Sequence, residues 1–119
     1  MLIKRIHKAF RGEGKTNWLV ENAIDASIIV RDNVADGNES VPLFYVGSLN
    51  RYTNFCQVYE NTMHHKCQIP IWDLSSMEGC HYAILFTDDL MDEFEYLPKN
   101  LPEGGLWYIT MSAEDFTNN

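Results

Sequence analysis

A glycine-rich segment near the N-terminus contains residue types that can bind phosphate. Gly12 and Gly14 lie within residues 11–16, and Lys15 follows the second glycine directly. Glycines allow backbone N–H groups to close around phosphate oxygens, and a helix that starts at such a turn directs its positive end at the anion. The segment therefore predicts a phosphate-binding loop.

Residues 10–19, Phe-Arg-Gly-Glu-Gly-Lys-Thr-Asn-Trp-Leu, resemble the P-loop of nucleotide-binding NTPases. In the pattern G-x-x-x-x-G-K-[ST], Gly14, Lys15 and Thr16 match, whereas Ala9 takes the place of the first glycine. The resemblance implies that ATP or GTP binds with Mg²⁺, that Lys15 reaches the β- and γ-phosphates, and that Thr16 ligates the metal. The expected nucleotide-binding residues are Arg11, Gly12, Glu13, Gly14, Lys15 and Thr16. The structural alternative is a glycine turn in which Thr16 caps an ordinary helix.

Two acids follow the most clearly apolar strand of the chain. The run Tyr-Ala-Ile-Leu-Phe-Thr at 82–87, followed by Asp88 and Asp89, resembles the Walker B strand of the same family. The resemblance implies that Asp88 holds the Mg²⁺ shell and that Asp89, the candidate catalytic residue, stands where a water-activating glutamate often lies. Aspartate is one methylene shorter than glutamate, so we expect hydrolysis to be slow or absent. The alternative is a core strand that ends in a solvated acidic turn.

Predicted strands and helices alternate along the chain. The expected strands are 2–10, 41–47, 82–87 and 106–111, with a short extended piece at 68–72; the expected helices are 16 to about 31, 50–66 and a turn at 90–96. The β-branched residues 28–30 could instead begin a strand. The last strand resembles the one that ends in a sensor residue, with Thr110 or Ser112 as its polar tip. The alternation predicts an α/β fold, with a small, mostly parallel sheet flanked by helices as in P-loop NTPases, and one domain over 1–119.

Charge is distributed unevenly along the chain. The formal net charge is −8, which argues against direct nucleic-acid binding through phosphates. Basic residues gather at the N-terminus, and acids gather in the last third. Those acids are Asp88, Asp89, Asp92, Glu93, Glu95, Glu103, Glu114 and Asp115. They form either an ordinary solvated surface or a face for a metal or a protein partner.

Composition also predicts the compartment. No apolar stretch approaches the roughly 20 residues of a membrane span, and the N-terminal residues lack the apolar run of an export signal. Cys56, Cys67 and Cys80 are odd in number and are not spaced like zinc ligands. We therefore expect reduced thiols, a cytoplasmic protein and no membrane partner.

Two functions follow from these features. The first is a nucleotide-binding protein that hydrolyses ATP or GTP slowly or not at all. The second is a non-enzymatic interaction or inhibitor protein, which retains the fold without the chemistry and docks a basic surface through its acidic C-terminal third. Small P-loop proteins encoded by phages and other mobile elements have this look, with the assembly ATPases of filamentous phages as a distant comparison. Ala9, and Glu13 as an acid where phosphate should sit, favour the second function; Gly-Lys-Thr together with Asp-Asp favours the first, which is the working hypothesis.

Overall fold

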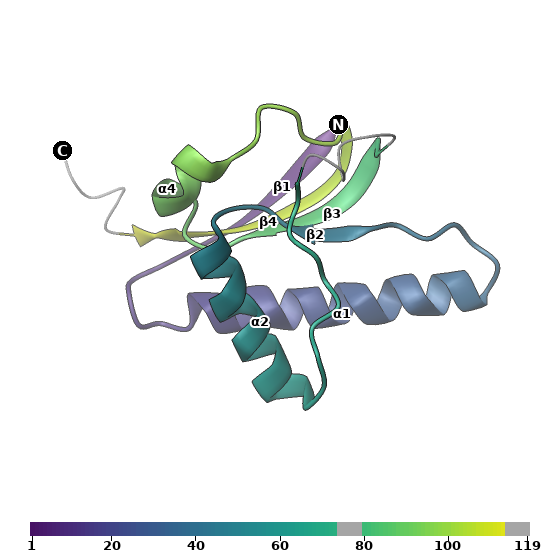
Figure 1. The fold of residues 1–119 in the computed structure, drawn as a ribbon, viewed down its shortest axis with the longest axis horizontal. Helices are drawn as coiled ribbons and strands as arrows, with labels where there is room; N and C mark the ends of the chain where they lie inside the picture. Colours follow the sequence, from purple (N-terminus) through teal and green to yellow (C-terminus); the bar gives the residue numbers. More distant parts are fainter. Residues whose placement is uncertain (74–79, 114–119) are drawn as a thin grey trace.

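Strands and helices alternate in the computed structural model, which describes residues 1–73 and 80–113 (Figure 1). The elements are β1 (Leu2–Ala9), α1 (Lys15–Ala35), β2 (Leu43–Tyr45), α2 (Leu49–Met63), β3 (Tyr82–Thr87), α4 (Leu90–Glu93), a 3-10 turn (Phe94–Tyr96) and β4 (Gly104–Ser112). The predicted α/β class is therefore confirmed. The acids Glu114 and Asp115 lie outside the described residues.

The described strands form one parallel sheet in the order β1-β4-β3-β2. Because the strands are parallel, their carboxyl ends meet at one edge of the sheet, on the left of Figure 1. β4 comes last in the chain but lies between β1 and β3, with Ile109 opposite both Ile6 and Thr87. The end of β4 is therefore placed between the loop that follows β1 and the acids that follow β3.

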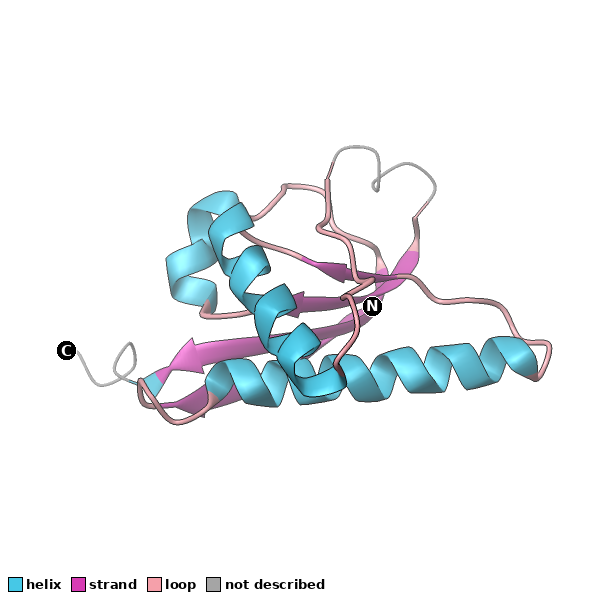
Figure 2. Cartoon of the chain, turned by 60° about the horizontal axis from the view of Figure 1, so that its bottom comes forward, coloured by secondary structure: helices cyan, strands magenta, loops and turns pink. Residues whose placement is uncertain are grey.

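Helices α1 and α2 cover one face of the sheet (Figures 1 and 2). Leu19 and Ala23 of α1 and Phe55 of α2 are buried together with Tyr45 and Phe86 from the strands. The apolar residues of α1 recur every three or four positions, so one side of the helix is continuously apolar and packs on the sheet.

The opposite face is covered by the segment that follows β3. Leu85 and Ile109 are fully buried there with Trp107, and Leu90 and Leu97 pack against them. The central strands are thus buried on both faces, as parallel strands usually are. Helices α1 and α4 connect strands in opposite directions across the sheet and lie on opposite faces, so the two crossovers have the same hand.

A short extended piece extends the sheet beyond β2, as 68–72 predicted. Ile71 forms a parallel bridge with Tyr45, whose N–H donates to the Pro70 carbonyl at 2.9 Å and whose carbonyl accepts from the Trp72 N–H at 2.8 Å. The chain therefore continues outward after β2 before it returns to β3. The connection through α2 therefore runs outward along the sheet, as the connection through α1 does, and two crossovers of the same hand that run in the same direction place their helices on the same face.

Helix α1 runs further than the sequence predicted. The β-branched residues 28–30 are helical, so a strand there is wrong, and the helix continues to Ala35. No glycine or proline interrupts it before Gly37, which has φ 90° and donates its N–H to the Val34 carbonyl at 3.0 Å. A continuing helix adds one hydrogen bond per residue, which outweighs the small strand preference of β-branched side chains. None of the described helices is long and apolar enough to cross a membrane.

The other differences lie at the ends of elements. β2 is shorter than the predicted strand at 41–47, and β4 is longer than the one at 106–111. α2 ends at Met63 and not at residue 66, because His64 adopts a left-handed conformation with φ 60°. Such a residue stops helix propagation.

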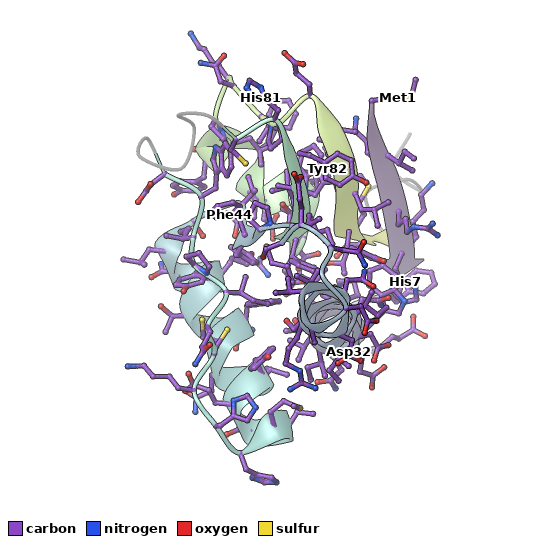
Figure 3. All side chains as sticks on the ribbon, turned by 90° about the vertical axis from the view of Figure 1, so that its right-hand side faces the viewer. Met1, His7, Asp32, Phe44, His81 and Tyr82 are labelled. Carbon is purple, nitrogen blue, oxygen red and sulfur yellow. The ribbon has the colours of Figure 1, made fainter. Side chains whose placement is uncertain are left out.

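The amino ends of the strands lie at the edge of the sheet away from the glycine-rich loop. Figure 3 views the molecule from this side, with Met1 and Tyr82 at the strand starts and Asp32 near the far end of α1. Gly105 lies in this region, between β1 and β3, and has φ 122°. The amino edge of the sheet therefore contains closely packed backbone, whereas the candidate site lies at the carboxyl edge.

Candidate functional site

The loop between β1 and α1 contains two glycines in left-handed backbone conformations. Gly12 and Gly14 have φ values of 84° and 77°, which residues with a side chain rarely adopt. Helix α1 begins at Lys15 with neither a side-chain cap nor an acid in its first turn. The first N–H groups of a helix lack intrahelical partners, so an anion bound here would satisfy them. A hollow of about 370 Å³ opens at this point, lined by Arg11, Gly12, Gly14, Lys15, Thr16, Asn17 and Asp89.

Lys15 is only 7 % exposed, and its ammonium group lies at the carboxyl edge of the sheet. Nζ donates to the Ser112 hydroxyl at 3.0 Å and lies 3.6 Å from Asp89 Oδ1. A buried ammonium group is unfavourable unless it is paired, and the ends of β3 and β4 supply both partners. The loop lysine is thus held in place by two elements distant in the sequence.

The Asp88 carboxylate joins the loop to the sheet. Its Oδ2 accepts from the Thr16 hydroxyl at 2.5 Å, and its Oδ1 accepts from the Thr110 hydroxyl. Asp88 is 1 % exposed, and its N–H donates to the Tyr45 hydroxyl at 3.3 Å. Thr16 therefore does not cap α1, and Asp88 does not lie in a solvated turn. Both structural alternatives considered from the sequence are wrong at these residues.

Asp89 adopts a left-handed conformation, with φ 51° and ψ 68°, at the start of α4. Its N–H donates to the Thr110 hydroxyl at 2.8 Å, and its Oδ1 accepts from the Ser112 hydroxyl at 3.1 Å. The same oxygen faces Lys15, whereas Oδ2 accepts from Arg51 Nη1 at 2.9 Å. Asp89 is therefore brought into the site, but as a carboxylate that is already paired with two cations.

Arg51, in the first turn of α2, belongs to the site of its own chain. Its guanidinium donates to Asp89 and to Asp92, the latter at 2.6 Å. Partial burial lowers the pKa of Arg51, but the carboxylates of Asp89, Asp88 and Asp92 outweigh this effect and raise the pKa overall. The sequence patterns did not identify Arg51 as a residue of the candidate site. Its place directly after β2, whose carboxyl end meets those of β3 and β4, was the signal that could have found it.

Glu93 is a buried carboxylate, 1 % exposed, that connects α4 to the start of α2. It accepts from the Ser48 N–H at 2.7 Å, the Ser48 hydroxyl at 2.9 Å and the Tyr45 hydroxyl at 3.4 Å. Burial raises the pKa of Tyr45, so this hydroxyl remains a donor. Ser48 in turn caps α2 by accepting from the Arg51 N–H at 3.3 Å. Sequence reasoning missed the role of Glu93, because nothing local distinguishes it from the exposed acids around it.

Two other charged residues of interest do not point into the hollow. Glu13 accepts from the Phe10 N–H at 2.7 Å, so its carboxylate braces the start of the loop, and it is not among the residues that line the hollow. Arg31 lies about 24 Å from Lys15 along α1, at about 1.5 Å per residue. It pairs with Asp32 at 3.8 Å and cannot reach the site of its own chain.

The acids of the C-terminal third do not form one exposed face. Asp88 and Glu93 are buried, and Asp89 and Asp92 pair with Arg51. These four acids therefore serve the candidate site, which leaves fewer charges for docking a basic partner than the sequence suggested.

The Thr16 hydroxyl and the Asp88 carboxylate lie side by side, and the oxygen atoms of both groups can ligate a metal ion. Mg²⁺ is commonly held by one or two protein oxygens together with substrate phosphates and water, so this pair fits an ion that binds with a nucleotide. Within 1–73 and 80–113, no group of three or more His, Cys, Asp or Glu residues could hold a metal ion without such help. Cys56, Cys67 and Cys80 are free thiols.

Comparisons with protein-family models, with curated proteins and with solved structures found no match to this chain.

Proposed function

We propose that the chain binds ATP or GTP together with Mg²⁺ through the loop at 11–16. The proposal rests on one observation: a buried lysine and a hydroxyl–carboxylate pair meet at an uncapped helix N-terminus. A lysine side chain is almost never fully buried unless it is paired, and a simple glycine turn before a helix does not require a buried lysine. Lys15 is buried beside the positive end of α1, so its ammonium group and the first N–H groups of the helix lie together in an arrangement suited to a polyphosphate.

Each group then has a definable role. Backbone N–H groups of the loop and Lys15 bind phosphate oxygens, while Thr16 and Asp88 hold the metal. Mg²⁺ held there would supply positive charge that offsets the negative charge of the phosphates. Thr110 keeps Asp88 oriented by donating to the oxygen that Thr16 does not use. Ser112 contacts Lys15 from the end of β4.

Nucleotide binding is expected to raise the melting temperature of the protein. A ligand at about 100 times its dissociation constant stabilises the native state by about 2.7 kcal/mol. Differential scanning fluorimetry with Mg-ATP and Mg-GTP measures the shift. Lys15→Ala should abolish it, whereas Lys66→Ala, which removes the same charge from an exposed position after α2, should retain it. If neither nucleotide shifts the melting temperature of the unmodified protein at millimolar concentration, the proposal is wrong.

Replacing Asp88 should weaken nucleotide binding only when Mg²⁺ is present. Asp88→Asn keeps the shape of the side chain but removes the charge that Mg²⁺ needs, so affinity for Mg-ATP should fall about tenfold or more. In EDTA, the affinity for ATP should remain close to that of the unmodified protein. Calorimetric titrations with and without Mg²⁺ make the comparison, and an equal loss in both conditions would assign Asp88 to folding instead.

A further inference from the structure

Asp89 pairs with two cations of the candidate site, Lys15 and Arg51. Its Oδ1 lies 3.6 Å from Lys15 Nζ, and its Oδ2 lies 2.9 Å from Arg51 Nη1. Each oxygen of one carboxylate thus faces one cation. Asp89 also lines the hollow next to the loop, together with Lys15.

A phosphoryl group can make the same two contacts. Its oxygens are spaced comparably to those of a carboxylate and carry more charge, and arginine binds either group with its planar fork. Lys15 is expected to leave Asp89 when a nucleotide binds, because the loop directs this lysine to phosphate. The place that Asp89 would then vacate, between Lys15 and Arg51, matches a terminal phosphate.

We propose that the γ-phosphoryl group of a nucleoside triphosphate displaces Asp89 from between Lys15 and Arg51, so that Arg51 makes the site select triphosphates over diphosphates. The inference rests on the proposed nucleotide binding and adds to it a specificity residue and an internal competitor. Asp89 acts against binding, since its ion pairs must break before the phosphate can replace them. A diphosphate competes only for Lys15 and gains nothing from Arg51.

The surroundings of Arg51 allow this exchange. The side chain is 33 % exposed, so it can shift, and Asp92 at 2.6 Å together with Glu93 at 3.8 Å keeps it beside the site when Asp89 leaves. Ser112 keeps a hydrogen bond available to Lys15 and another to Asp89.

Calorimetric titration with Mg²⁺ and either ADP or a non-hydrolysable ATP analogue tests the inference. Arg51→Gln should weaken binding of the triphosphate analogue about tenfold and leave ADP within about twofold, and Arg51→Lys should restore part of the difference. Asp89→Asn should tighten binding of the analogue about tenfold. Glu95→Gln is the matched control, since it removes one negative charge from an exposed position in the 3-10 turn after α4 and leaves Asp89, Lys15 and Arg51 in place; its effect should be much smaller.

The outcomes separate this inference from the proposed function. If the unmodified protein binds both nucleotides, Lys15→Ala abolishes binding, and Arg51→Gln weakens both equally, the inference is overturned while the proposed function stands. The same conclusion follows if Asp89→Asn tightens binding no more than Glu95→Gln does. Absence of nucleotide binding to the unmodified protein overturns both. Asp89→Asn retains Arg51 and the buried Glu93, so it tests the inference even if Arg51→Gln fails to fold.

Discussion

Gly105→Ala is expected to destabilise the protein by about 3 kcal/mol or more. Gly105 lies at the start of β4, in the middle of the sheet, opposite Leu2 of β1 and Ala83 of β3. A Cβ atom there would lie 1.8 Å from the Ala83 carbonyl oxygen, and the backbone φ of 122° is unfavourable for any side chain. The neighbouring atom is backbone, so it cannot move aside without separating two paired strands. Denaturant unfolding followed by circular dichroism measures the loss.

Gly37→Ala is the matched control for backbone strain. Gly37 has φ 90°, but a Cβ atom there would meet nothing within 4 Å. Its replacement should therefore destabilise the fold by only about 1 kcal/mol. If Gly105→Ala destabilises the protein no more than Gly37→Ala does, the close approach of β4 to β3 described here is wrong.

Hydrolysis of nucleotide by the isolated protein is expected to be absent or on the order of 10⁻² s⁻¹ at most, the range of P-loop GTPases whose arginine lies in cis. Asp89 is the candidate water-activating acid, and nucleotide binding is proposed to displace its carboxylate from Lys15 and Arg51. The side chain of Asp89 is short for a general base, which limits its reach toward a water molecule. A phosphate-release assay with Mg-ATP and Mg-GTP measures the rate across a range of protein concentrations.

The concentration dependence identifies any contribution from a second subunit. Turnover of several per second at low concentration would contradict this description of the site. Arg31→Ala should leave the rate unchanged, because Arg31 lies about 24 Å along α1 from Lys15. If turnover appears only at high concentration and is lost in Arg31→Ala, the active arrangement is instead shared between two copies of the chain.

Local sequence was sufficient to predict two separate parts of this protein, the strand before the paired acids and the glycine turn before α1. The strand at Tyr82–Thr87 was predicted with its observed bounds, because a short apolar run that is followed at once by two acids is typical of a buried strand that ends where the acids begin. The glycine turn before α1 was also predictable, since only glycine readily adopts the left-handed conformations seen at Gly12 and Gly14. Both signals depend on residues within a few positions of each other.

Only the tertiary structure decided how these parts meet. The insertion of β4 between β1 and β3 places Ser112 against Lys15 and Thr110 against Asp88, and no periodicity in the sequence specifies that order. The same holds for Arg51, which pairs with an acid 38 residues away. Strand order depends on which apolar surfaces fit together across long sequence separations. The burial that results strengthens the electrostatic interaction within each charged pair. The sequence alone therefore indicated which residues of the loop could bind phosphate, while the packing of the sheet determined that one carboxylate, Asp89, faces both Lys15 and Arg51.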